Sequence, residues 1–269
     1  MTLFFLQIPS GNVSEADWDR LQYYSRKVKV FDAICDDDPK VHPSTYLRIA
    51  QLLSRSSDSA LFPSLRHLHY YLDATSTSGS YIFLFQSPFL YSLKLFNISG
   101  FENTIAGPFL ATLSSESQML SRIVLNSGQL SVDIFRKSIV HFRQLRSLEL
   151  LDAVSMSDFA LWEALGTLPS LANFTLKALD PASYPAHAPK NLNRQSGSSE
   201  YFEALESLCV TGPFFLIQHL LDFIDSAYLT SINITIHPLI NHVCNKLEPE
   251  DPFTSSMTIV ASTASGHNL

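Results

Sequence analysis

The sequence predicts an α/β protein shaped as an arc, with a parallel sheet on the concave face and helices and irregular segments on the convex face. One observation is a pattern of the form L-x-x-L-x-L that recurs seven times. A second is its period, because successive copies begin 24 to 34 residues apart. A third is the helical spacing of apolar residues between copies. The copies begin at Leu65, Leu90, Leu120, Leu145, Leu171, Leu205 and Leu229.

Each copy predicts one short strand. The last two apolar positions of the pattern are two residues apart, so they lie on one face of a strand while the residue between them faces the other way. A period of about 20–29 residues is that of leucine-rich repeats, whose strands stack side by side into a solenoid. We therefore expect one leucine-rich-repeat domain over residues 14–260, with tails at 1–13 and 261–269.

Three segments depart from the regular period. The longest step between copies contains residues 180–200, which are rich in Pro, Ser, Asn and Gly and therefore predict a surface insertion. A weaker eighth copy is expected at residues 28–30, where the sequence is Val-Lys-Val. A further strand is expected at 257–260, where Met, Thr, Ile and Val follow one another.

Helices are expected between the strands. Ser14 and Asp17 form a capping-box pattern at the start of the first helix, and Pro43 precedes the second. Ser131 is a candidate N-cap for a third helix, and Pro213 suits the first turn of the last one. The expected helices cover residues 14–24, 44–53, 132–142, 159–165 and 214–224.

Composition and charge exclude several classes of protein. Hydrophobic residues make up 46% of the 269 residues and charged residues 16%, which excludes a disordered chain. The net charge of −7 argues against nucleic acid as a partner. No apolar run is long enough to span a membrane. Because the three cysteines are widely spaced and no secretory leader is evident, we expect a cytoplasmic or nuclear protein without disulfides or a zinc site.

We expect no enzymatic activity and no cofactor. The chain has no G-x-S-x-G nucleophile motif and no glycine-rich phosphate-binding motif. His67 and His69 share a strand face, but a metal site needs further ligands, so we interpret both as surface residues. Residues 36–39, three aspartates and a proline, predict a solvated turn. The large aromatic residues expected in the core are Trp18, Trp162, Phe214 and Phe215.

A partner-binding surface is expected on the concave face of the sheet. The residues before, between and after the last two apolar positions of each copy point away from the leucine core, and together they form one continuous surface. Because aromatic and guanidinium groups dominate protein interfaces, Tyr71, Phe96 and Arg122 are the expected anchors. The candidate partner-binding residues are His67, His69, Tyr71, Lys94, Phe96, Arg122, Asn126, Glu149, Asn173 and Lys177.

Short phrases at residues 61–68, 145–150 and 168–171, together with 41–46, resemble a known family. They are similar to the repeat halves of F-box/leucine-rich-repeat proteins of the divergent type found in mushroom-forming fungi. The resemblance implies a ubiquitin-ligase adaptor, in which the repeats bind a protein target and the F-box docks onto cullin-based ligase subunits. Residues 1–13 are too short for an F-box, so we expect the F-box to be absent.

The resulting hypothesis is a non-catalytic protein-recognition module whose target the sequence does not identify. Ligase subunits would be further partners if a longer product carries an F-box. Four alternatives stay open: a truncated family remnant without a partner, a leucine-rich-repeat scaffold unrelated to ubiquitin, an enzyme, and a secreted receptor-type repeat. The last would carry glycans at the sequons that begin at Asn12, Asn97, Asn173 and Asn233.

Overall fold

The strands of the protein form a single sheet, and their order in the sheet follows their order in the sequence. Strands β1 to β8 are parallel, so the protein is an α/β protein with one parallel sheet, as the sequence predicts. The computed structural model describes residues 14–33, 43–55, 60–72, 77–98, 103–126, 132–151, 159–178, 201–224, 226–237 and 257–262.

All seven copies of the repeated pattern form strands, and the copies align with one another. In β3, the residues between and around the two leucines, Ser92, Lys94 and Phe96, pair with His67, His69 and Tyr71 of β2. The same alignment continues from strand to strand to β8. The strands are β1 Val30–Ala33, β2 His67–Tyr71, β3 Ser92–Phe96, β4 Arg122–Asn126, β5 Ser147–Leu151, β6 Asn173–Lys177, β7 Ser207–Pro213, β8 Ser231–His237 and β9 Met257–Ser262.

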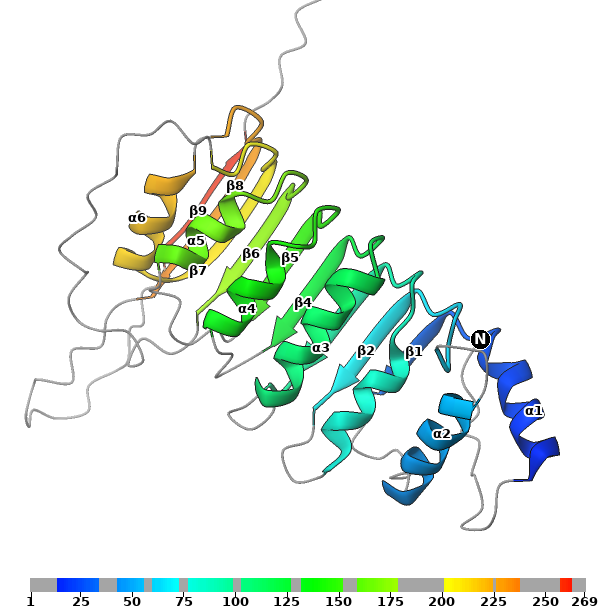
Figure 1. Ribbon diagram of the computed structural model, residues 1–269. Helices are drawn as coiled ribbons and strands as arrows, with labels where there is room; N and C mark the ends of the chain where they lie inside the picture. Colours follow the sequence, from blue (N-terminus) through cyan, green and yellow to red (C-terminus); the bar gives the residue numbers. More distant parts are fainter. Residues whose placement is uncertain are drawn as a thin grey trace, which may run out of the picture.

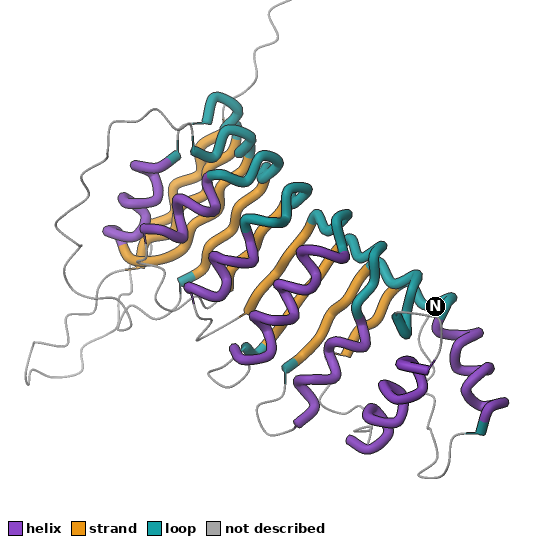
Figure 2. The backbone as a smooth tube through the Cα atoms, in the orientation of Figure 1, coloured by secondary structure: helices purple, strands orange, loops and turns teal. Residues whose placement is uncertain are grey.

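The helices lie on one face of the sheet (Figure 1, Figure 2). They follow one another in chain order, and α3 contacts α4, α4 contacts α5, and α5 contacts α6. The predicted capping box of α1 is confirmed, because the Ser14 hydroxyl accepts the Asp17 N–H while the Asp17 carboxylate accepts the Ser14 N–H. The helices are α1 Glu15–Ser25, α2 Pro43–Arg55, the 3₁₀ helix η1 Thr77–Phe85, α3 Asn103–Glu116, α4 Val132–Ile139, α5 Phe159–Gly166 and α6 Phe214–Phe223.

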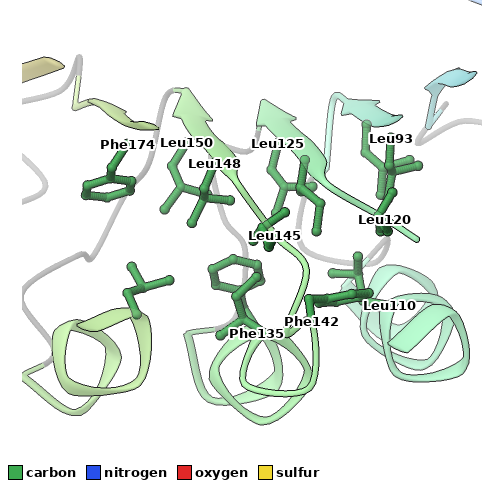
Figure 3. Packing of buried hydrophobic residues seen from close by; sticks show 14 of the residues in the cluster. Leu93, Leu110, Leu120, Leu125, Phe135, Phe142, Leu145, Leu148, Leu150 and Phe174 are labelled. Atoms are coloured by element: carbon green, nitrogen blue, oxygen red, sulfur yellow. The ribbon is translucent and has the colours of Figure 1, made fainter. Parts of the chain in front are cut away.

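The core fills the space between the sheet and the helices (Figure 3). Leu145, Leu148 and Leu150, the three apolar positions of one copy, are all fully buried there. Phe135 of α4 and Phe142 of the following turn reach the same layer from the other side. Each additional repeat extends this layer by one strand, so one hydrophobic cluster runs from α2 to β8.

Backbone hydrogen bonds before strands β2 to β8 repeat with the period of the sequence pattern. The N–H groups of two consecutive residues donate to a single carbonyl of the preceding repeat, as Arg146 and Ser147 do to Ser121. Just before this, the N–H of the first leucine closes a turn, as Leu145 does on Phe142. These bonds satisfy the backbone where the chain turns into the sheet, and they hold the first residues of β2 to β8 in equivalent places.

Buried serines support two of these turns. The Ser117 hydroxyl donates to the Ser87 carbonyl at 2.6 Å, and the Ser87 hydroxyl donates to the Pro63 carbonyl at 3.2 Å. Both serines are buried. The turn positions of other repeats hold large apolar residues, such as Phe142 and Leu168. A serine can therefore replace a core residue here because its hydroxyl finds a backbone acceptor in the preceding repeat.

The two ends of the sheet differ from the sequence prediction. The last strand, β9, is confirmed as a strand but pairs antiparallel with β8, so the sheet is not parallel throughout. It also extends to Ser262, beyond the expected boundary at residue 260. At the other end, β1 begins at Val30, which is exposed. Phe31 turns inward and packs on the rings of Phe62 and Phe85, so it takes the position that Leu68 has in the next copy.

Some helical boundaries are also corrected. The third predicted helix ends at Ile139, and Val140 is exposed because the chain leaves the helix there. Pro213 is the extended last residue of β7, with φ −69° and ψ 149°, and α6 begins after it. Phe214 was expected in the core but is 60% exposed, because it lies on the outer side of α6. Trp162 is buried as predicted.

Two helices were not predicted from the sequence. In α3, Gly107 and Pro108 are adjacent, a pair that normally ends a helix. Gly107 is buried, and a Cβ atom at this position would collide with the Ile134 side chain of α4. Close approach of α3 and α4 therefore requires the glycine, and tertiary packing outweighs local propensity. The 3₁₀ helix η1 has no regular helical spacing of apolar residues.

Several predictions concern residues outside the described segments. These are the aspartate turn at 36–39, the insertion at 180–200, the tail at 1–13, residues 263–269 of the second tail, and the N-cap at Ser131. No described helix is long and apolar enough to cross a membrane.

Candidate functional site: the helix-free face of the sheet

The candidate site is the face of the sheet opposite the helices (Figure 1). We call it the helix-free face and define it by the residues of β1 to β8 that alternate with the core positions. Among the described residues no helix lies on this side. All ten predicted partner-binding residues belong to it and come from five consecutive strands, β2 to β6. Residues up to 110 positions apart in the sequence, from His67 to Lys177, therefore share one surface.

Aromatic side chains gather on its N-terminal part. Tyr71 is 38% exposed and pairs in register with Phe96, which is partly exposed on the next strand. At the other end of the same strands, the rings of Tyr91 and His67 pack in an edge-to-face arrangement, with 6.1 Å between ring centroids. Tyr91 is exposed and directly precedes β3. Aromatic rings are thus available to a partner at both ends of β2 and β3.

An ion pair crosses the middle of the face. The Arg122 guanidinium donates a hydrogen bond to the Glu149 carboxylate, with Nη2 and Oε1 2.6 Å apart. Glu149 aligns with Val124, so the pair runs diagonally between β4 and β5. Val124 alternates with the core residues Ile123 and Leu125 of β4 and aligns with Glu149, but it is only 4% exposed. A buried apolar side chain therefore lies beside the ion pair on this face.

Histidines and a lysine lie beside this pair. The Nδ1 atom of His69 is 3.4 Å from Oδ2 of Asp32, the residue aligned with it on β1. Burial lowers the pKa of His67 below its ordinary value of 6.5, and the nearby His69 and Arg66 add to this effect. Lys94 aligns with His69 on one side and Val124 on the other. In the described part of the chain, no carboxylate pairs with Lys94.

The remaining predicted residues mark the limit of the charged region. Asn126 is partly buried at the end of β4, whereas Asn173 and Lys177 are exposed at the two ends of β6. Beyond β6 the middle positions are Cys209 and Asn233, which carry no charge. Cys209 is a free thiol of intermediate exposure. The helix-free face therefore consists of a charged, aromatic N-terminal part and a C-terminal part of small polar side chains.

Sequence reasoning missed the lead-in residues, which directly precede the first outward residue of a strand. Lys29, Arg66 and Arg146 each directly precede an outward strand residue, and all three are exposed. Their carbonyls accept hydrogen bonds from the two N–H groups at the start of the next strand. This places the three residues in line with Tyr91, along the edge of the sheet where the strands begin. The signal was present in the sequence, because these positions directly follow the first apolar residue of each copy.

The structure bears on two other possibilities, a metal site and glycosylation of the sequons. Within the described segments, no three His, Cys, Asp or Glu side chains gather closely enough to hold a metal ion. Of the sequons, Asn97 already uses its side-chain amide to donate to the Leu72 carbonyl at 2.8 Å. Asn173 and Asn233 lie within strands, as predicted.

Comparison with known proteins does not assign the chain to a family. No protein-family model matches the chain, and no curated protein matches it in sequence.

Proposed function

We propose that the chain is a leucine-rich-repeat solenoid that binds a protein partner through its helix-free face and has no catalytic activity. The observation that carries the proposal is the alignment of the strands. Because each copy contributes its outward residues at the same height, Tyr71, Phe96 and Arg122 lie on one continuous surface. Repeat proteins use extended surfaces of this kind to bind other proteins.

The composition of the surface supports a protein as the partner. Its exposed residues combine aromatic rings, a guanidinium and short polar groups, which are enriched in protein interfaces. The sheet holds these side chains on a rigid backbone, so little conformational entropy is lost when a partner binds. An extended sheet face, to which many strands contribute side chains, suits a protein surface or a peptide better than a small molecule.

We further propose that the chain acts as the substrate-binding part of a ubiquitin-ligase adaptor. This part of the proposal depends on the resemblance of residues 61–68, 145–150 and 168–171 to F-box/leucine-rich-repeat proteins. A target bound on the helix-free face would be held for ubiquitin transfer by ligase subunits that dock elsewhere on the protein. Binding of a protein by the helix-free face and the role in a ubiquitin ligase can be tested independently.

Affinity capture with matched variants tests the first half. The tagged wild-type chain, a Tyr71→Ala/Phe96→Ala double variant and a Leu47→Ala/Phe214→Ala control are expressed in the native host. The control removes two apolar side chains that are each 60% exposed, on helices α2 and α6. We expect proteins that the wild type and the control capture to be lost from the double variant. Equal capture by all three would contradict the proposal.

The same samples test the ligase role. Because ligase subunits would dock away from the helix-free face, we expect cullin-ligase subunits to remain with the double variant after the target is lost. If no ligase subunit accompanies any of the three chains while a target does, the protein binds its partner independently of ubiquitin ligation.

A further inference from the structure

The charge of the N-terminal part of the helix-free face, taken with the residues that lead into its strands, is opposite to that of the whole protein. The chain carries a net charge of −7. The outward and lead-in positions of β1 to β5, by contrast, hold more cations than anions. The anions among them are Asp32 and Glu149. The cations are Lys29, Arg66, Lys94, Arg122 and Arg146.

Both anions already have partners on the protein itself. Asp32 lies against His69, and Glu149 accepts a hydrogen bond from Arg122. Lys94 lies between these two pairs and has no carboxylate partner among the described residues. Its ammonium group is therefore left to attract an external anion, and the exposed Arg66 at the start of β2 adds to the same field.

Aromatic groups adjoin this cation. Phe96 is two residues along β3 from Lys94 and shares its face, and Tyr71 pairs with Phe96 on β2. A ligand that brings a carboxylate to Lys94 can therefore place an apolar side chain against the two rings. This combination of an unpaired cation and adjacent exposed rings defines a binding site for an anionic and partly apolar ligand.

We propose that the partner of the helix-free face presents an acidic peptide segment, in which Asp or Glu binds at Lys94 and a neighbouring aromatic or aliphatic side chain packs on Tyr71 and Phe96. This inference rests on the proposed function and specifies the class of partner. A peptide fits better than nucleic acid, because it needs only one carboxylate at Lys94, whereas a phosphate backbone carries a charge at every nucleotide and would also meet Asp32, Glu149 and a protein of net charge −7.

Selection from a displayed library of random peptides tests the inference. The full chain is used as bait, and synthetic copies of the enriched peptides are then titrated by fluorescence anisotropy against three proteins. These are the wild type, Lys94→Glu and the matched control Lys137→Glu. Lys137 is an exposed residue of α4, so the control makes the same change in net charge on the helical side of the protein. Circular dichroism confirms that each variant is folded.

We expect enriched peptides to contain Asp or Glu next to an aromatic or aliphatic residue. Lys94→Glu should weaken their binding by about tenfold or more, since it replaces attraction with repulsion, while Lys137→Glu changes it less than about twofold. Arg66→Glu should weaken binding in the same direction, and added salt should weaken binding to the wild type.

Several results would overturn the inference. If the selected peptides lack acidic residues but lose affinity in the Tyr71→Ala/Phe96→Ala variant, the helix-free face binds proteins and only the acidic class is wrong. If the selected peptides bind that double variant as well as the wild type, the proposed function fails as well. If no peptide is selected, the peptide segment is wrong, and the affinity capture described above decides whether the face binds a folded protein surface. Tighter binding of a single-stranded oligonucleotide, lost in Lys94→Glu, would replace the peptide with nucleic acid.

Discussion

Arg122 and Glu149 form a hydrogen-bonded ion pair across β4 and β5, and Val124 lies almost completely buried beside them although it faces away from the core. The pair joins two repeats on the surface that we propose to bind a partner. Both side chains keep part of their exposure, 46% for Arg122 and 27% for Glu149, so water still screens the charges. The main effect of the ion pair is therefore to hold the Arg122 and Glu149 side chains in place.

This screening predicts a small contribution to stability. In a double-mutant cycle of Arg122→Ala and Glu149→Ala, we expect a coupling free energy of about 0.2–1 kcal/mol, the range of partly exposed ion pairs. Urea unfolding of the four proteins measures it. A coupling well above this range would mean that the pair is a structural support of the sheet.

The buried ring of Phe174 predicts a large loss of stability on truncation. Phe174 is 1% exposed, and its ring lies between those of Trp162 and Phe202, with 6.2 Å between centroids on both sides. Phe174→Ala should therefore lower the free energy of unfolding by about 3–5 kcal/mol. The exposed Phe214 of α6 is the matched control, and Phe214→Ala should change it by less than about 0.5 kcal/mol. Similar losses for both variants would contradict the packing described.

The serine turns predict a smaller, specific loss. Ser117→Ala removes the buried hydroxyl that donates to the Ser87 carbonyl, so we expect a loss of about 1 kcal/mol. Ser115 is the matched control, because its hydroxyl donates to the Thr112 carbonyl on the exposed side of α3. Ser115→Ala should leave stability nearly unchanged. Thermal unfolding of both variants compares them, and equal midpoints would show that the buried hydrogen bond contributes nothing.

His67 predicts a dependence of stability on pH. Its pKa in the folded protein is lowered from 6.5, first by burial and then by repulsion from His69 and Arg66. The unfolded chain therefore takes up the proton first as the pH falls, and this favours unfolding. The contribution of His67 to stability should decrease as the pH drops from about 6.5 towards the lower, folded pKa, and this contribution should change no further below that value.

An NMR titration of the His67 imidazole checks this directly. Arg66→Gln removes one repelling cation, so the pKa of His67 should rise towards its ordinary value, and the loss of stability in mild acid should become smaller. A His67 pKa at or above its ordinary value in the wild type would contradict the described environment.

The strands were the part of the fold that the sequence could predict. In the copy that contains Leu90, Leu93 and Leu95, successive side chains of the strand point to opposite faces. Because Leu93 and Leu95 must both be buried, the residues that alternate with them must point outward. The alignment between strands then follows from the repeat. By contrast, α3 was missed because Gly107 and Pro108 disfavour a helix locally, and the reason for the glycine lies in a neighbouring element, at Ile134.

The candidate site was predictable as a surface but not in its internal contacts. Aligning the copies brings Arg122 level with Ser147 and Val124 level with Glu149, but the diagonal pairing of Arg122 with Glu149 depends on side-chain conformation. The lead-in residues Arg66 and Arg146 were missed because a strict alternation assigns them to the buried side. In the structure these residues are exposed instead, because two consecutive N–H groups at the start of β2 to β8 donate to one carbonyl and interrupt the alternation there.

Photo-crosslinking from two positions tests the central claim, that the helix-free face binds a protein partner, most directly. A photoreactive phenylalanine analogue replaces Tyr71 on β2 or, as a control, the more exposed Phe214 on α6, and the full chain is irradiated in cells of the native host. We predict a discrete protein adduct from position 71 that is absent from position 214. Adducts only from position 214, or the same adducts from both positions, would contradict the assignment of partner binding to this face.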